Sequence, residues 1–387
     1  MKKVVYIHQY FKTPEEGGAI RSYHIAKEMV NRAIKVDMIT SHNKPVYHFQ
    51  HVAGINVHYL PVSYSNDLSF LKRYIAFIKF AIAAIRYFKK LKKPDLVYAT
   101  STPLTVGIVA LCMKWTKGIP YLFEVRDLWP EAPIQLGILK NQLLKLISKR
   151  LEKIIYKHAI KIIALSPGIE RGILHRYGNA KINLIPNMAD VDFFNHDRSR
   201  IHKKKQLIIG YFGAFGLVNN LEFILNLANE CQKVKLPIIF KLVGEGAKKK
   251  EIEQMIQEMK LKNVHIFPHK NHSEIKELMD EVDACVTSFL KVPILETSSP
   301  NKFFDGLAAG KLSIVNTKGW LKTLVEENRC GIYIDPDEVY RFPKLIQPFI
   351  EDKALLKSYQ KNALLLANQK FSKDKLVGEI CDLILSI

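Results

Sequence analysis

The sequence predicts an α/β protein built from two doubly wound, parallel-sheet domains. In both halves, short apolar runs alternate with helical patterns, which is typical of a parallel sheet with crossover helices on both faces. The alternation breaks at residues 196–206, which are polar, charged and without periodicity. Each half also opens with a strand, a glycine-bearing loop and a helix. We therefore expect a domain at 1–200, a second at 201–371, and a C-terminal helix, 372–387, that can pack back on the first.

The individual elements follow from apolar runs bounded by turn residues and from apolar residues at helical spacing. In the first half, strands are expected at 4–10, 36–40, 55–62, 95–100, 121–125 and 160–166, with helices after Arg21, at 70–93 and at 140–158. In the second half, strands are expected at 207–213, 238–246, 263–268 and 284–289, with helices at 219–232, 248–260, 273–281 and 302–309. A chain of 387 residues exceeds the size of one ordinary core, which agrees with two domains.

The composition is that of a soluble globular protein, with 48% hydrophobic and 25% charged residues. The five cysteines are scattered and form no CxxC pair, so we expect reduced thiols and a cytoplasmic location. No signal peptide is recognisable at the N-terminus. The most apolar helix is interrupted by Lys79 and Arg86, so no membrane-spanning segment is expected.

The net charge of +21 is unevenly distributed. Residues 1–200 hold 31 Lys and Arg against 14 Asp and Glu, whereas residues 201–387 hold 27 against 23. This asymmetry predicts an anionic partner for the first half, either nucleic acid or an acidic membrane surface. No nucleic-acid recognition module or basic run interleaved with aromatics is present, so nucleic acid is not expected.

Two basic helices favour the membrane. In 70–93, basic residues recur every seven positions, at Lys72, Lys79, Arg86 and Lys93. In 140–158, one face carries Lys145, Lys149, Lys153 and Lys157, with Leu144, Ile147, Leu151 and Ile154 opposite. The ordinary alternative is a core-facing helix with a solvated lysine edge. A basic edge beside apolar residues also suits the anionic inner face of a membrane, and we expect peripheral contact there.

Three glycine loops are expected at the carboxyl ends of the strands, where open α/β sheets bind ligands. They are EEGGAIRS with Gly17 and Gly18, GYFGAFG with Gly213 and Gly216, and GEGAKKK with Glu245 and Lys248. Each glycine alone is more often a simple turn than a phosphate contact. GYFGAFG lacks the GxGxxG spacing, which argues against a nicotinamide dinucleotide site.

The stretch PNKFFDGLAAGK, residues 300–311, predicts a loop that runs into a helix. Lys302 at a helix N-terminus is well placed for a diphosphate, because its charge adds to the helix dipole. Asp305, one turn further, suits ribose hydroxyls, and Glu296 on the preceding loop suits sugar hydroxyls. The ordinary alternative is a solvated Lys302 and an Asp305 that only favours an early helical turn.

Another polar cluster, FEVRDLWPEAP at 123–133, ends a strand and contains Arg126, Asp127 and Glu131. It is either a functional cluster or a salt-bridged structural loop. The pair Asp190 and Asp192 has the spacing of a DxD metal motif, but no acidic or histidine partner stands nearby. We interpret it as a turn and expect no metal.

Taken together, these segments resemble the retaining family 4 glycosyltransferases of the GT-B fold over nearly the whole chain. YFKTPEEGGAIRSYHIAKEM resembles that family's donor-cleft glycine loop, and LIPNMADVDFF, LVGEGAKKKEIE and ETSSPNKFFDGLAAGK resemble three further motifs. FEVRDLWPEAP resembles a segment of the branch that includes bacterial L-fucosamine transferases of O-antigen synthesis. Two departures stand out: Asp305 replaces the usual Glu, and GAFGLVNN lacks the usual Arg and Lys, whose role falls to Lys302 with Lys248.

The resemblance implies a role for each candidate residue. Catalytic roles fall to Asp127, Glu296 and Lys302. Donor contacts fall to Gly17, Gly18, Arg21, Gly213, Gly216, Glu245, Lys248, Ser299, Pro300, Asn301 and Asp305. Acceptor contacts fall to Arg126 and Glu131.

The implied function is retaining transfer of a sugar, an N-acetylated hexosamine by the branch, from a UDP-sugar. The implied acceptor is a polyprenyl-diphosphate-linked sugar or glycan in bacterial surface polysaccharide (lipopolysaccharide or capsule) synthesis. No cofactor or metal is implied, because cationic side chains and helix N-termini stabilise the departing UDP. Two alternatives stay open: a GT-B UDP-sugar 2-epimerase, and a catalytically silent GT-B binding protein.

Overall fold

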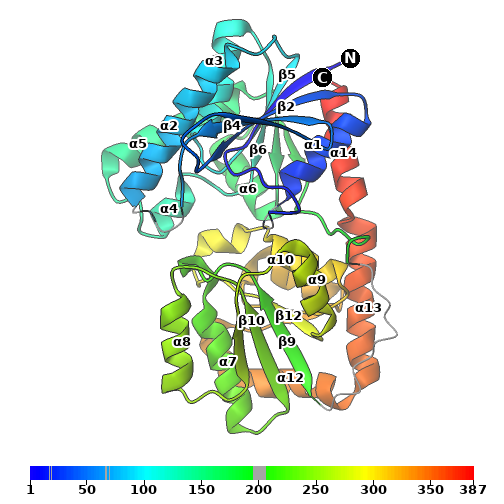
Figure 1. Ribbon diagram of the computed structural model, residues 1–387. Helices are drawn as coiled ribbons and strands as arrows, with labels where there is room; N and C mark the ends of the chain where they lie inside the picture. The colour runs from blue at the N-terminus through cyan, green and yellow to red at the C-terminus, as the bar shows by residue number, and fades with distance from the viewer. Residues whose placement is uncertain (17, 19, 66–67, 69, 195–205) are drawn as a thin grey trace.

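The computed structural model describes residues 1–16, 18, 20–65, 68, 70–194 and 206–387. It shows two α/β domains stacked one above the other, each built on its own sheet (Figure 1). Gly17 lies outside the described residues, as does the expected linker at 196–206 except for its last residue.

The first domain contains an eight-stranded sheet in the order β3-β4-β2-β1-β5-β6-β7-β8. Its strands are β1 (Lys3–Ile7), β2 (Lys35–His42), β3 (His48–Val52), β4 (Ile55–Pro61), β5 (Leu96–Thr100), β6 (Tyr121–Val125), β7 (Lys161–Ala164) and β8 (Ile182–Leu184). All neighbours pair in parallel except β3, which forms an antiparallel hairpin with β4. The sequence did not predict β3, because HFQHV is polar and largely exposed and has no apolar run.

Six helices of the described chain belong to this domain. They are α1 (Arg21–Asn31), α2 (Phe70–Phe88), α3 (Val106–Lys117), α4 (Glu131–Gln135), α5 (Gln142–His158) and α6 (Pro167–Arg176). The basic helix expected at 70–93 therefore ends at Phe88, and the one expected at 140–158 begins at Gln142. Helix α3 was not predicted from sequence. Gly118 ends it in the left-handed conformation, with φ of 66°.

Helix α5 does not match the ordinary alternative of a core-facing apolar side. Ile147 and Ile154 are 49% and 38% exposed. Glu152, Ile155 and Tyr156 are buried instead. The burial of Glu152 could not be predicted, because its ion pair with Arg176 is a contact between helices that periodicity cannot reveal.

The second domain contains a six-stranded, wholly parallel sheet in the order β11-β10-β9-β12-β13-β14. Its strands are β9 (Leu207–Phe212), β10 (Ile238–Val243), β11 (Val264–Phe267), β12 (Ala284–Thr287), β13 (Leu312–Val315) and β14 (Gly331–Tyr333). The helices around it are α7 (Leu221–Lys233), α8 (Lys249–Glu258), α9 (His272–Asp280), α10 (Asn301–Ala308), α11 (Thr323–Glu327), α12 (Phe342–Glu351) and α13 (Lys353–Lys370), with short turns η1 (Leu217–Asn219), η2 (Pro293–Thr297), η3 (Lys318–Lys322) and η4 (Pro336–Arg341).

The chain then returns to the first domain. Helix α14 (Lys373–Leu385) packs against α1, and its Leu376, Val377 and Ile380 are buried (Figure 1). At the return point, Ala189 N–H donates to the Phe371 carbonyl at 2.7 Å, and Lys373 N–H donates to the Ala189 carbonyl at 3.0 Å. The two chain segments that pass between the domains are thus joined by backbone hydrogen bonds.

Two further findings concern the described residues only. None of their helices combines the length and apolar character needed to cross a bilayer. All five cysteines are free thiols, and four of them are buried.

Candidate active site

The amino end of α10 carries Lys302, the residue around which the second-domain site is built. Helix α10 begins at Asn301, and Pro300 at its N-cap makes no side-chain hydrogen bond to the first turn. The first N–H groups of the helix therefore receive no side-chain cap, and a helix end in this state is a ready anion site. Lys302 lies in this first turn, as the sequence predicts.

The ammonium of Lys302 is held by neutral partners. Its Nζ donates to the Tyr211 hydroxyl at 3.0 Å and to Asn219 Oδ1 at 3.1 Å. It also lies 4.4 Å from the Tyr211 ring centroid and 5.5 Å from that of Phe289. Within the described part of the chain, no carboxylate forms an ion pair with it. Desolvation lowers the pKa of Lys302 to about 7, because nothing of opposite charge offsets the loss of water.

Gly213 is brought directly to this ammonium. A Cβ built on Gly213 would lie 3.3 Å from Lys302 Nζ, so any larger residue here would crowd the lysine. The second glycine loop packs on the first: a Cβ on Gly244 would meet the Gly213 carbonyl, and one on Gly246 would meet the Phe215 backbone. Both have positive φ, 157° and 152°. Glycine is therefore required at these two positions.

The other predicted residues of these loops lie at the surface. Lys248 donates to both oxygens of Glu251 at 2.6 Å, and Glu245 accepts from Lys249 at 2.7 Å. Such exposed pairs along a helix exchange easily with solvent or ligand. Gly216 precedes η1, and the last residue of η1, Asn219, accepts the hydrogen bond from Lys302. The donor roles of Glu245, Lys248 and Gly216 stay predictions.

Asp305 lies one turn along α10 from Lys302 and is partly buried. Burial raises the pKa of its carboxyl to about 7, with a further contribution from the negative charge of Asp190. Asp190 itself accepts from Lys373 at 2.8 Å and lies 3.7 Å from His24. The DVD stretch is therefore part of the contact with α14, in keeping with the expected turn. Among the described residues, no cluster of three metal-binding side chains is found.

The loop before α10, which carries Glu296, is tied to the first domain. Thr297 carbonyl accepts from Ser166 Oγ at 2.5 Å, and Ile294 N–H donates to Gln135 Oε1 at 3.0 Å. Asn187 contributes twice, with its N–H to Ser299 Oγ at 3.2 Å and its Nδ2 to the Ser299 carbonyl at 2.5 Å. These contacts hold the Glu296 loop where the two domains meet.

Two predicted donor residues are occupied by structural contacts. Ser299 is 8% exposed and bound by Asn187, which argues against a direct donor contact. Arg21 is 2% exposed, with its Nε 3.0 Å from Glu124 and its remaining donors on the Pro186 and Ile185 carbonyls. The guanidinium of Arg21 is thus bound by the protein itself, and its expected contact with the donor stays a prediction. The sequence could not show that Glu124, 103 residues away, neutralises it.

The first-domain cluster lies just beyond the end of β6. Arg126 NH1 is 3.4 Å from His8 Nε2, and the other His8 nitrogen is 2.7 Å from Ser22 Oγ. Burial and the charge of Arg126 hold the pKa of His8 well below its usual value, so a neutral imidazole accepts from Arg126. Asp127 is exposed. Nevertheless, desolvation by nearby protein atoms raises the pKa of its carboxyl, and the positive charge of Arg126 opposes that rise.

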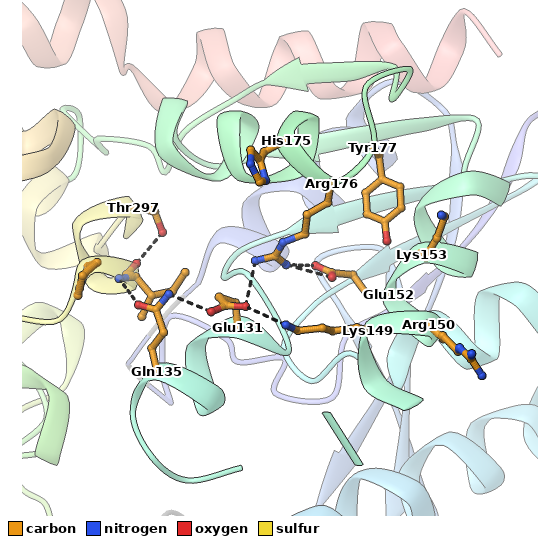
Figure 2. Close-up of a pocket in the computed structure, with 12 residues that line it drawn as sticks. Glu131, Gln135, Lys149, Arg150, Glu152, Lys153, His175, Arg176, Tyr177 and Thr297 are labelled. Carbon is orange, nitrogen blue, oxygen red and sulfur yellow. Dashed lines mark hydrogen bonds and ion pairs between the residues drawn. The ribbon is translucent and has the colours of Figure 1, made fainter. Parts of the chain in front are cut away.

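Glu131, the other predicted acceptor residue, belongs to a charged pocket of about 780 Å³ (Figure 2). Arg176 NH1 donates to both oxygens of Glu152, at 2.8 and 3.0 Å, and its NH2 lies 3.5 Å from Glu131. Lys149 is 3.9 Å from the same Glu131 oxygen. Figure 2 shows Arg176 between the two carboxylates.

Sequence reasoning missed several residues of these sites. Tyr211 and Asn219 position Lys302, and Asn187 and Gln135 fix the Glu296 loop. Tyr211 belongs to the GYFGAFG segment and Asn219 follows it closely, so the segment itself was the available signal. Nothing in the local pattern marks Arg176 or Glu152, since both read as ordinary charged positions of amphipathic helices.

Family models match both halves of the chain. Residues 16–188 match the glycosyl transferase 4-like domain, and residues 192–365 match the glycosyl transferases group 1. Among curated relatives, a protein of Escherichia coli (strain K12) named as a colanic acid biosynthesis glycosyl transferase, WcaI, is 28% identical over 132 residues, 34% of this chain and 31% of the relative. WbjE of Pseudomonas aeruginosa, named as a glycosyltransferase, is 20% identical over 303 residues, 74% of each chain.

Solved structures share the fold over the full chain. A sucrose-phosphate synthase from Thermosynechococcus elongatus superimposes with a TM-score of 0.81 at 18% identity, covering 100% of this chain and 99% of the other. Anabaena HepE in complex with UDP-glucose gives 0.73 at 18% identity, covering 100% of both. The solved structures and the two parallel-sheet domains show the GT-B fold. The two domain models together match residues 16–188 and 192–365, and the chain therefore belongs to the glycosyltransferases.

Proposed function

We propose that this glycosyltransferase moves a sugar, an N-acetylated hexosamine, from UDP to a lipid-linked or glycan acceptor, with retention of anomeric configuration. The observation that carries the donor half is Lys302. A partly buried ammonium with only neutral partners is costly to the folded protein, and an anionic ligand would supply the missing charge. The UDP complexes of HepE, a structural neighbour, support a uridine diphosphate as that anion.

The proposed chemistry assigns one task to each part of the site. The diphosphate lies against Lys302, the Gly213 loop and the uncapped end of α10, which stabilise the charge that develops on departing UDP. Glu296 holds the donor sugar, and Asp305 the ribose. Asp127, from the other domain, orients the acceptor. The ammonium and the helix end take the place that a metal ion fills in other transferases, so no metal is required in this proposal.

Membrane association is the second part of the proposal. Helix α2 exposes a row of Leu71 (68%), Ile75 (43%), Ile78 (39%) and Ile82 (45%) beside Lys72 and Lys79. Helix α5 exposes a comparable row, and the two helices flank α3 on one side of the first domain (Figure 1). Exposed apolar rows edged by lysine suit the surface of an anionic membrane. We place the enzyme on its cytoplasmic face, where it acts in surface polysaccharide synthesis.

A nucleotide panel tests the donor. We expect UDP, rather than GDP, ADP or CMP, to raise the unfolding temperature of the wild-type chain, and Lys302→Met to remove most of that shift. A UDP-N-acetylhexosamine supplied with a lipid-linked acceptor should then yield a glycoside whose anomeric configuration, read by NMR, equals that of the donor. Conversion of UDP-sugar without acceptor into its 2-epimer would identify an epimerase instead. If none of the four nucleotides binds, the proposal of a nucleotide-sugar donor is contradicted.

A further inference from the structure

The charged pocket beside α5 is distinct from the Lys302 site and has no assigned ligand. We call it the α5 pocket, defined by Lys149, Arg150 and Lys153 of α5 with Arg176 at the end of α6. Helix α4 and the η2 turn of the second domain close its other walls. It therefore lies where the two domains face each other (Figure 2).

The charges of the α5 pocket do not balance. Glu152, 1% exposed, and Glu131 compensate Arg176 and Lys149. Arg150 and Lys153 have no ion pair within the described part of the chain, so two cations of the pocket are left without an acidic partner. Burial also raises the pKa of Glu152 to about 7, against the opposing effect of Arg176, which further weakens the negative side. The surplus suits an anion with more than one charge.

The pocket adjoins the residues proposed to act on both substrates. Thr297 and Ile294 on its wall flank Glu296 on either side in the η2 turn. Glu131 and Gln135 on its opposite wall belong to α4, which follows Asp127 after three residues. An anionic group in the pocket can therefore carry a sugar toward the junction of the two domains.

An exposed apolar row runs beside the pocket on the same helix. Leu143 (64%), Leu146 (49%), Ile147 (49%) and Ile154 (38%) are exposed on α5. At 100° per residue, Arg150 lies about 60° from Ile147 and about 40° from Ile154, and Lys153 lies about 20° from Leu146. The basic and apolar side chains of α5 therefore interleave on one exposed face that borders the pocket. An amphiphile with a charged head and a long apolar tail matches both.

We propose that the α5 pocket binds the diphosphate of a prenyl-diphosphate-linked acceptor, with Arg150, Lys153 and Arg176 on the phosphate oxygens and the prenyl chain along the apolar row of α5. This assignment rests on the proposed function. The phosphate is bound apart from the donor diphosphate, which occupies Lys302. The pocket thereby selects acceptors by their anionic carrier.

Calorimetry with farnesyl diphosphate, kept below its micellar concentration, tests the assignment on the full chain. We expect farnesyl diphosphate to bind, and we expect farnesol and inorganic pyrophosphate each to bind much more weakly. Arg150→Gln and Lys153→Gln should each weaken farnesyl diphosphate binding roughly tenfold. Lys157→Gln is the matched control, an exposed lysine of α5 one turn beyond Lys153 and outside the pocket, and should leave it unchanged. UDP affinity should be unchanged in all three variants.

The possible results separate this inference from the proposed function. If UDP displaces farnesyl diphosphate, and if Arg150→Gln and Lys153→Gln leave its affinity unchanged, farnesyl diphosphate occupies the donor site. That result would overturn the assignment. If inorganic pyrophosphate binds as tightly as farnesyl diphosphate, the prenyl chain contributes nothing to binding. That result would overturn the assignment of a lipid-linked ligand. Equal losses in Lys153→Gln and Lys157→Gln would indicate diffuse surface attraction and also overturn it. Binding of farnesyl diphosphate without any binding of UDP would support the pocket while the donor half of the function fails.

Discussion

Donor binding should be accompanied by proton uptake at Lys302. In the free protein the pKa of this lysine is lowered to about 7. A bound diphosphate would return it to about 10.5 or above, because an adjacent negative charge favours the ammonium. At pH 8 the free lysine is roughly one-tenth protonated and the bound one fully so, which gives an uptake of about 0.9 proton per UDP; at pH 6 the uptake falls to about 0.1.

Calorimetry measures this number directly. The observed enthalpy of UDP binding at pH 8 is plotted against the ionisation enthalpies of several non-phosphate buffers, and the slope is the number of protons taken up. The same linkage weakens UDP binding by up to about tenfold for each pH unit above 7. At pH 8 the second phosphate ionisation, near pKa 6, is complete, and Asp305, with a pKa of about 7, is already mostly ionised, so neither obscures the slope.

Lys302→Met serves as the control. It should take up no proton, bind UDP far more weakly, and unfold at a temperature no lower than that of the wild type, since a buried cation is removed. A slope near zero for the wild type at pH 8, despite UDP binding, would refute the reasoning. So would an equal slope in Lys302→Met.

Three other predictions concern the surroundings of this lysine. Burial raises the pKa of Asp305, so between pH of about 4 and 7 the folded chain holds more protons than the unfolded one, and stability falls as pH rises. Asp305→Asn should flatten that fall in urea unfolding, and equal slopes would contradict the burial argument. Gly244→Ala should cost about 1–3 kcal/mol and weaken UDP binding, because its Cβ meets the Gly213 carbonyl. Gly178→Ala, which meets nothing within 4 Å, is the matched control and should be near neutral in the same assay. Asn187→Ala loses the hydrogen bond from Nδ2 to the Ser299 carbonyl, while the backbone N–H bond to Ser299 Oγ remains. It should lower stability by about 1–3 kcal/mol and raise KM for the UDP-sugar. An unchanged KM would mean that this contact does not hold the Glu296 loop.

Much of the architecture could be predicted because it depends on local patterns. Alternating strands and helices indicated both parallel sheets, and Tyr121–Val125 was placed at the correct bounds. The start of α10 was predicted because Pro300 and a helical apolar pattern are local signals. The site could be predicted only as far as its glycine loops and its lysine.

What the sequence did not reveal depends on contacts between distant residues. The burial of Arg21 requires Glu124, and the neutral setting of Lys302 requires Tyr211, 91 positions away. The inward position of Glu152 on α5 could not be predicted, because it depends on an ion pair with Arg176 from another helix. Such pairings leave no mark on periodicity, since each partner looks like an ordinary surface residue in its own segment.

The return of α14 to the first domain has a consequence for synthesis. Helix α1 packs against α14, with Arg32 at the C-terminal cap of α1 paired to Asp382 of α14, and α14 is translated about 190 residues after β8 completes the first sheet. At roughly 5–20 residues per second, α14 is synthesised about 10–40 s after the last strand of the first domain. During that interval the second domain emerges and folds, so the first domain is completed by the segment that leaves the ribosome after it. A chaperone that shields α1 for those seconds would act on this enzyme before its cleft exists.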